Sequence, residues 1–116
     1  FKNQTLIKKF YRNSNLFIMP SREENWGLAV NEAMASGNSI ICSNLVGCSK
    51  NLVKNNYNGY IFKSDDFNDL AKKIFLFYKN PIKLNHFSNN SLKIISKYSF
   101  NECYKGIIKA INYVKL

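Results

Sequence analysis

The sequence predicts an α/β protein in which helices flank a Rossmann-like parallel sheet. Short apolar runs bounded by turn residues alternate with stretches of helical periodicity. The runs are continuous rather than alternating, which is typical of strands buried on both faces of a parallel sheet. The expected order is helix, strand, helix, strand, helix, strand and then a run of helices, which favours parallel strands joined by helical crossovers.

The first half of the chain is expected to hold all of the strands. Pro20 closes the first apolar run, Gly37 is the expected C-cap of the helix before the second, and Asn58-Gly59 is a strong turn signal before the third. The expected strands cover residues 16–19, 39–43 and 60–62. The expected helices cover residues 4–13, 27–36 and a short piece of "VGCSKNLV".

The second half is expected to be helical throughout. Ser64 or Asp65 is the expected N-cap of a helix that ends before Pro81. A second helix over 82–97 and a last helix from Ser99 to Val114 should follow. Ser99 and Glu102 have the spacing of a capping box.

Length and composition bound the class of protein. The chain has 116 residues, of which 46% are hydrophobic, so we expect one folded domain rather than a disordered segment. Its three cysteines show no CxxC spacing and the one histidine, His86, lies far from them, so no zinc site is expected. Cys42 lies in an apolar run as a buried thiol, and a reducing, cytoplasmic setting fits best.

The chain is basic, with a formal net charge of +10 from 17 Lys and Arg against 7 Asp and Glu. This balance raises nucleic acid, anionic membranes and phosphorylated ligands as partners. The lysines are scattered, and Arg12 and Arg22 are the only arginines, so the charges form no basic stripe. The strands are expected to be buried, so no sheet face with exposed aromatic residues is expected either. We therefore favour a solvated basic surface and expect no nucleic-acid binding. The charge also raises the hypothesis of peripheral association with the inner face of a membrane.

The most informative stretch is "SREENWGLAVNEAMASG", residues 21–37, which leaves the carboxyl end of the first expected strand. Ligands of such sheets bind beyond the carboxyl ends of the strands. The first amides of the following helix lack intrahelical partners and carry partial positive charge, which suits a phosphate or diphosphate. We expect Gly27, which has no Cβ, to let a ligand approach the backbone.

Two acids, Glu24 and Glu32, lie on either side of this expected helix start. Carboxylates repel phosphate but accept hydrogen bonds from hydroxyls, and a nucleotide sugar carries hydroxyls on both sides of its diphosphate. A purely structural interpretation stays open, in which Glu32 compensates the helix dipole and Trp26 is a surface aromatic.

The run from Phe17 to Ile74, "FIMPSREENWGLAVNEAMASGNSIICSNLVGCSKNLVKNNYNGYIFKSDDFNDLAKKI", resembles the donor-binding half of a GT-B glycosyltransferase of the family-four (group 1) type. Glu24 and Glu32 enclose seven residues, "NWGLAVN", and "EAMASG" follows. The downstream features that match are Gly47, Asn58-Gly59, the acidic pair Asp65-Asp66 and Leu70-Ala71. The resemblance covers residues 5–78 closely and the terminal helices loosely.

The resemblance implies that residues 1–116 form the C-terminal nucleotide-sugar-binding domain of a longer, two-domain enzyme. That enzyme would transfer a sugar from a UDP- or GDP-sugar, with retention at the anomeric carbon and without metal or other cofactor. Glu24 matches the catalytic acid that contacts hydroxyls of the donor sugar, and Glu32 matches the acid that binds the ribose. The loop residues matched to the donor's sugar and phosphate are Asn25, Trp26, Gly27, Leu28 and Ala29.

The resemblance also implies a setting. The acceptor would be a glycan or lipid bound by a missing N-terminal domain, in bacterial surface polysaccharide biosynthesis at the cytoplasmic side of a membrane. The isolated chain should be inactive because half of the cleft is absent. A non-catalytic nucleotide-sugar-binding or interaction module remains the alternative.

The sequence departs from the family pattern at two positions, and it does not include the family's earlier strands. Trp26 stands where the family often has Phe, and Asn51 stands where it often has an acid. The diphosphate-binding Arg and Lys of the family would lie in earlier strands that this sequence lacks. Lys50 and Lys54 are alternative cations, although a solvated surface role is favoured for both.

Overall fold

The computed structural model describes residues 3–114 and confirms the predicted class. Its sheet has three parallel strands in the order β1-β2-β3, with Ile18 of β1 opposite Ile41 of β2, and Ile41 opposite Tyr60 of β3. The strands are β1 (Leu16–Met19), β2 (Ser39–Ser43) and β3 (Gly59–Phe62). Because the strands are parallel, the loops that follow them all lie at one edge of the sheet.

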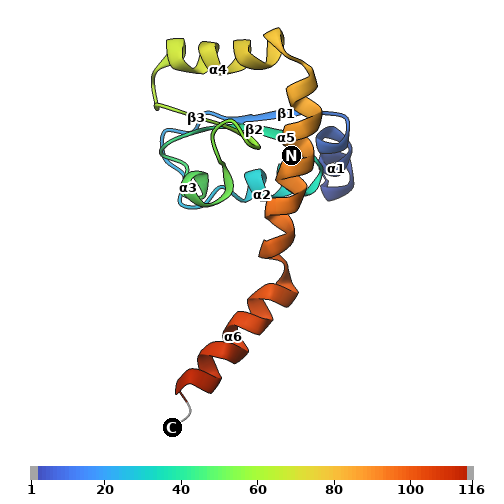
Figure 1. Cartoon of the computed structure of the whole chain (residues 1–116), viewed down its shortest axis with the longest axis vertical. Coiled ribbons are helices and arrows are strands. Elements are labelled where there is room, and N and C mark those ends of the chain that lie inside the picture. Colours follow the sequence, from blue (N-terminus) through green and yellow to red (C-terminus); the bar gives the residue numbers. More distant parts are fainter. Residues whose placement is uncertain (1–2, 115–116) are drawn as a thin grey trace.

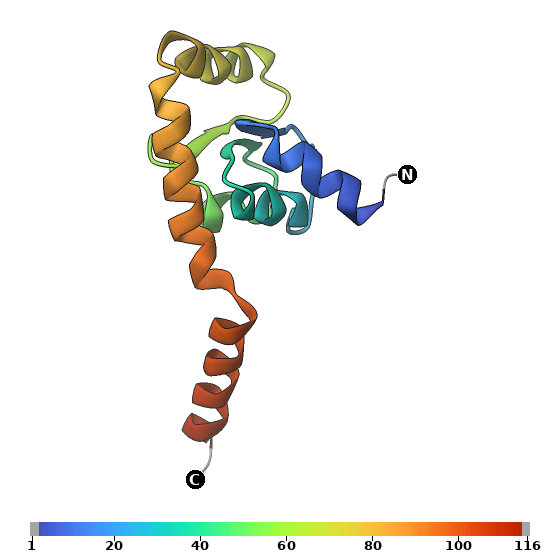
Figure 2. The same ribbon diagram turned by 90° about the vertical axis from the view of Figure 1, so that its right-hand side faces the viewer.

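Helices cover both faces of the sheet (Figure 1). α4 lies on one face, α2 and α3 lie on the other, and α5 crosses from the level of α4 to that of α2 (Figures 1 and 2). The helices are α1 (Gln4–Arg12), α2 (Leu28–Ala35), α3 (Ser49–Leu52), α4 (Phe67–Lys79), α5 (Ile82–Ile95) and α6 (Phe100–Val114), with a 3₁₀ turn, η1 (Ser96–Tyr98), before α6. α6 extends away from the rest of the chain (Figure 2).

Two apolar clusters, one on each face of β2, form the core. Ile40 and Cys42 point toward α2 and pack with Val30, Met34 and Leu52, among others. The second cluster joins the opposite face of the sheet to α4 and α5, and its buried members are Ile41, Tyr60, Phe62, Phe77 and Phe87. The alternation of Ile40, Ile41 and Cys42 between two clusters explains why β2 reads as an unbroken apolar run.

The expectation that every strand is buried on both faces is wrong for β1. All four residues of β1 are half-buried, whereas all five residues of β2 are buried. The physical reason is position: the side chains of β1 lie at the margins of the two apolar clusters, Phe17 and Met19 on one and Leu16 and Ile18 on the other. Its composition resembles that of an interior strand, but within residues 3–114 only β2, which pairs on both sides, is buried along its whole length.

Several predicted helix ends need correction. α2 begins at Leu28 rather than Gly27, and α5 ends at Ile95 rather than 97. The N-cap of α4 is Asp66, whose carboxylate accepts from the Asp69 amide at 2.8 Å, rather than Ser64 or Asp65. Among residues 3–114, no helix combines the length and the apolar character that crossing a membrane requires.

The predicted capping box of α6 is only half formed. The Ser99 hydroxyl accepts from the Glu102 amide at 3.2 Å, as expected for a cap. The Glu102 carboxylate instead pairs with the Lys105 ammonium at 2.7 Å. The cap therefore fixes the start of α6 through Ser99 alone.

Candidate functional site

The loop that joins β1 to α2 is tied to the loop that follows β2. The Gly47 amide donates to the Glu24 carbonyl at 2.8 Å, and the Cys48 amide donates to the Trp26 carbonyl at 2.8 Å. Glu24 and Val46 also form an isolated parallel bridge. These contacts extend the β1–β2 pairing beyond the strands, so the loop that carries Glu24 has a defined backbone rather than that of a free surface loop.

Gly27 is required by the backbone, for a reason different from the one predicted. Its φ is +97°, a left-handed conformation that glycine adopts without strain. A Cβ at Gly27 would lie 2.8 Å from Val46 Cγ1 and 3.4 Å from Met19 Sδ. The missing side chain therefore faces the apolar core, and the expectation that it opens a path for a ligand is wrong.

The start of α2 presents unused amides at the carboxyl-end edge of the sheet. Gly27, the N-cap, supplies no side-chain cap, and the Val30 amide donates to the Gly27 carbonyl at 2.9 Å. Among residues 3–114, no backbone hydrogen bond uses the amides of Leu28 or Ala29. These two amides, with the helix dipole behind them, provide the partial positive charge that an anionic group requires.

Trp26 and Asn25 lie on the exposed side of this loop. Trp26 is 39% exposed, and its indole Nε1 donates to the Asn31 amide oxygen at 2.9 Å. That bond holds the indole beside the start of α2. Asn25 and Trp26 therefore face solvent on the loop that leads into α2.

Glu24 lies half-buried beside the Cys48 thiol. Burial raises the pKa of Cys48 to about 11, and the negative charge of Glu24 contributes to the rise. Carboxylate oxygens accept hydrogen bonds, so Glu24 can accept from hydroxyl groups of a ligand. Its position is set by the backbone bond from Gly47 and not by any contact that the sequence pattern reveals.

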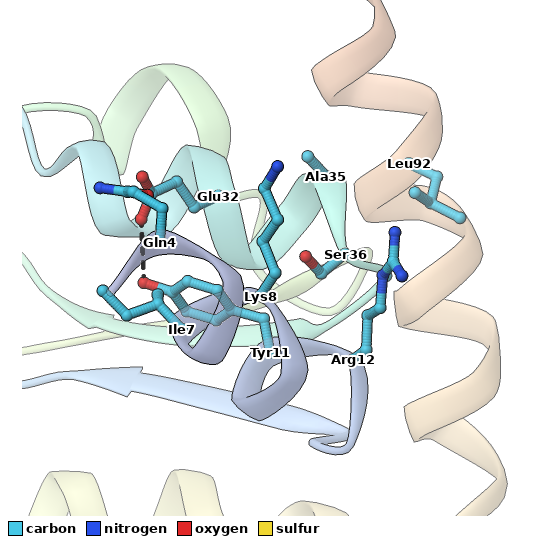
Figure 3. A pocket seen from close by; sticks show the side chains of 10 residues that line it. Gln4, Ile7, Lys8, Tyr11, Arg12, Glu32, Ala35, Ser36 and Leu92 are labelled. Carbon is cyan, nitrogen blue, oxygen red and sulfur yellow. Dashed lines mark hydrogen bonds between the residues drawn. The ribbon is translucent and has the colours of Figure 1, made fainter. Parts of the chain in front are cut away.

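Glu32 lies on the face of α2 that is directed toward α1, where Tyr11 donates its hydroxyl to Glu32 Oε2 at 3.1 Å (Figure 3). Burial raises the pKa of Tyr11, and the hydrogen bond to Glu32 and the charge of Glu32 raise it further. Glu32 lines a groove of about 510 Å³, together with Gln4, Ile7, Lys8, Tyr11, Arg12, Ala35, Ser36, Gly37 and Leu92. A second hollow, formed by α2 with residues from 95 to 103, also includes Glu32.

The structure thus arranges the predicted residues in two groups. Glu24, Asn25, Trp26 and the unused amides share the loop at the strand ends, whereas Glu32 lies one turn further along α2 beside α1. Sequence reasoning did not single out Tyr11, because its helical spacing with Leu6, Ile7 and Phe10 identifies it only as part of an expected helix. Its hydroxyl was the only signal of a polar partner.

An ion pair across the strand ends was also missed. Arg22, in the loop after β1, pairs with Asp65, in the loop after β3, at 2.6 Å. Both side chains are more than half exposed, at 76% and 59%, so the pair stabilises the fold by at most about 1 kcal/mol. Lys50 and Lys54 are exposed. In the described part of the chain, no cluster of three or more His, Cys, Asp or Glu side chains has a geometry suited to a metal ion.

The parallel sheet with helices on both faces defines an α/β domain of the Rossmann-like type. The chain belongs to the glycosyl transferases group 1 family, whose model matches residues 1–94. The resemblance inferred from the spacing of Glu24 and Glu32 is confirmed.

Curated relatives come from bacteria and archaea. An uncharacterized glycosyltransferase of Methanocaldococcus jannaschii is 27% identical over 103 residues, covering 89% of this chain and 29% of the relative. The N,N'-diacetylbacillosaminyl-diphospho-undecaprenol alpha-1,3-N-acetylgalactosaminyltransferase of Campylobacter jejuni is 29% identical over 110 residues, covering 95% of this chain and 27% of the relative. The chain therefore spans less than a third of the length of these relatives.

Solved structures share the fold. The crystal structure of TarM superposes with a TM-score of 0.81 at 23% identity, covering 94% of this chain and 22% of TarM. The crystal structure of Anabaena HepE in complex with UDP superposes with a TM-score of 0.81 at 19% identity, covering 91% of this chain and 29% of HepE. These similarities confirm the GT-B type of α/β fold.

Proposed function

We propose that this chain is the donor-binding domain of a retaining glycosyltransferase that uses a UDP- or GDP-sugar. The observation that carries the proposal is the loop from Glu24 to Gly27, which Gly47 and Cys48 fix at the strand ends beside the unused amides of α2. A diphosphate would lie on the Leu28 and Ala29 amides. Related proteins whose names include sugar transfer to undecaprenol-linked acceptors support a lipid or glycan acceptor and a role in surface polysaccharide synthesis.

The two acids would have separate roles. Glu24 would accept hydrogen bonds from hydroxyls of the transferred sugar and hold its anomeric carbon in position. Glu32 would accept from the ribose hydroxyls. The chemical step would depend on preorganised amides that stabilise the departing diphosphate, without a metal ion or other cofactor. HepE structures with UDP and with UDP-glucose support a uridine donor as the first candidate.

The acceptor would bind to a separate N-terminal domain, and the cleft would close between the two. The basic surface would assist peripheral association with an anionic membrane leaflet on the cytoplasmic side. Sedimentation with vesicles of phosphatidylglycerol at low salt checks this part. Absence of the chain from the vesicle pellet would contradict membrane association and leave donor binding unaffected.

The experiment that tests donor binding uses ligand-detected NMR and calorimetry on this chain. The ligands are UDP, UDP-glucose, GDP and GDP-mannose, and the variants are Glu24→Gln and Glu32→Gln. Loss of a charge-assisted hydrogen bond should weaken binding about tenfold. We expect Glu32→Gln to weaken the nucleotide and the nucleotide sugar alike, and Glu24→Gln to weaken only the nucleotide sugar.

Glu23→Gln is the matched control, because Glu23 is exposed on the same loop and the change in net charge is the same. It should leave all four affinities unchanged. Binding should also persist in excess EDTA. If Glu23→Gln weakens binding as much as Glu32→Gln, the effect comes from overall charge and the assigned roles of the two acids are wrong.

A further inference from the structure

Tyr11 and Glu32 form a polar pair between two helices that the sequence separates. The phenol hydroxyl of Tyr11 in α1 donates to Glu32 Oε2 in α2 at 3.1 Å, in a half-buried position. Burial, the hydrogen bond and the carboxylate charge all raise the pKa of Tyr11, so its hydroxyl keeps its proton and remains the donor at neutral pH.

The approach of the phenol to Glu32 is fixed by contacts at both ends of Tyr11. Its ring packs edge-on against Phe17 of β1, with centroids 5.7 Å apart and planes at 62°. Its carbonyl accepts from the Asn38 side-chain amide at 2.9 Å, and the same amide donates to the Ala33 carbonyl of α2 at 3.1 Å. Asn38, which is fully buried, therefore ties the backbone of Tyr11 to the helix that carries Glu32.

One hydroxyl proton can engage only one carboxylate oxygen, so Tyr11 occupies Oε2 and leaves Oε1 available. Both residues line the groove between α1 and α2, which is open to solvent (Figure 3). A glutamate without such a contact samples several rotamers and loses that freedom when a ligand binds. A glutamate already held by a rigid donor loses less, which increases affinity through preorganisation.

We propose that Tyr11 is a positioning residue that orients Glu32 so that its free oxygen accepts hydrogen bonds from the 2′- and 3′-hydroxyls of the donor ribose. Tyr11 thereby sets the preference of the site for ribonucleotides over deoxyribonucleotides without contacting the sugar. The role rests on the proposed function, because it requires a nucleotide whose ribose reaches Glu32.

The test compares wild type and Tyr11→Phe in their binding of UDP and 2′,3′-dideoxy-UDP by calorimetry, with the GDP pair in parallel. Tyr11→Phe keeps the ring against Phe17 and removes only the hydroxyl. We expect UDP to bind roughly tenfold more weakly to the variant, in line with the rotamer freedom of a glutamate side chain. The dideoxy nucleotide should bind equally to both proteins.

Tyr60→Phe is the matched control, since Tyr60 also donates its hydroxyl to a side chain, that of Asn56, at 3.2 Å, but lies in the other apolar cluster. It should change neither affinity. A second variant, Phe17→Leu, keeps the Tyr11 hydroxyl but loosens its ring, and should give a smaller loss that again requires the ribose hydroxyls. This variant keeps the proposal testable if Tyr11→Phe lowers the thermal midpoint enough to prevent binding measurements.

The outcomes separate this role from the proposed function. Equal weakening of UDP and the dideoxy nucleotide in Tyr11→Phe would make Tyr11 a packing residue only. Unchanged UDP affinity in Tyr11→Phe, together with weakening in Glu32→Gln, would overturn the role of Tyr11 and leave the donor site intact. If wild type binds none of the nucleotides, the proposed function fails and the role of Tyr11 fails with it.

Discussion

A side chain at position 47 would collide with the main chain of Asn25, because a Cβ on Gly47 would lie 1.8 Å from the Asn25 carbonyl oxygen. Gly47 also donates its amide to the Glu24 carbonyl at 2.8 Å. The loop that carries the first acid therefore depends on close backbone contact with a glycine from the loop after β2. A side chain at position 47 should therefore push the loop after β1 and the loop after β2 apart.

We expect Gly47→Ala to destabilise the fold by at least about 2 kcal/mol, because the clash is with backbone and no rotamer change relieves it. Urea denaturation followed by circular dichroism measures this change. Gly106→Ala is the control, since nothing lies within 4 Å of a Cβ there and the residue is in the middle of α6. That change should be neutral or stabilising by up to about 1 kcal/mol. Equal stability of the two variants would contradict the contact.

Gly27→Ala should be destabilising for two separable reasons, its left-handed φ of +97° and its approach to Val46 Cγ1. The left-handed conformation costs a non-glycine residue about 1–2 kcal/mol, and the clash adds to that. Measuring Gly27→Ala in wild type and in a Val46→Ala background separates the two costs. The cost should fall to about 1–2 kcal/mol when Val46 is truncated, and an identical cost in both backgrounds would show that Val46 is not the obstacle.

Asn38→Asp should be strongly destabilising at pH 7. A carboxylate cannot donate to the carbonyls of Tyr11 and Ala33, and it would be charged in a fully buried position. We expect a loss of about 3 kcal/mol or more, partly recovered at pH 5 as the carboxyl takes up a proton. Urea denaturation at both pH values checks this. Asn101→Asp, at an exposed position of α6, should show little loss at either pH.

Stability should fall at alkaline pH through the two buried thiols. Burial raises the pKa of Cys42 from 9.0 to about 12 and that of Cys48 from 9.0 to about 11. A raised pKa means that the folded state holds the proton more tightly, so this stability is complete below pH 9. It is lost as the pH rises from 9 toward 11 for Cys48 and toward 12 for Cys42, at about 1.4 kcal/mol per pH unit for each thiol.

The pH dependence can be assigned with single variants in reducing buffer. Cys48→Ala lowers the free energy of unfolding at pH 7, and this loss is subtracted at every pH. The remaining free energy of unfolding should then fall less steeply with pH between pH 9 and 10.5 than it does in wild type. Cys103→Ala, at an exposed position, should leave the slope unchanged. If Cys48→Ala has the same pH dependence as wild type, other groups cause most of the loss of stability at alkaline pH.

Much of the fold follows from local patterns. The runs 16–19 and 39–43 match β1 and β2 in their bounds, because each is a short continuous apolar run bounded by residues that favour turns or loops. Helix ends were less predictable. Ser64, Asp65 and Asp66 can each cap a helix, and the choice of Asp66 depends on the path of the chain out of β3.

The candidate site also has a part that the sequence predicts and a part that only the tertiary structure decides. Glu24 and Glu32 lie close together in the sequence, on either side of a helix start. Their spacing and the family that it indicates could therefore be inferred from the sequence alone. The contacts of Glu32 with Tyr11 and of Gly47 with Asn25 could not, because each joins segments brought together only by the pairing of β1 with β2 and the packing of α1 on α2. Local periodicity specifies which residues face inward. Which of these residues contact one another depends on strand register and helix packing. The free energy that decides register and packing comes from contacts throughout the domain, and not from any one segment.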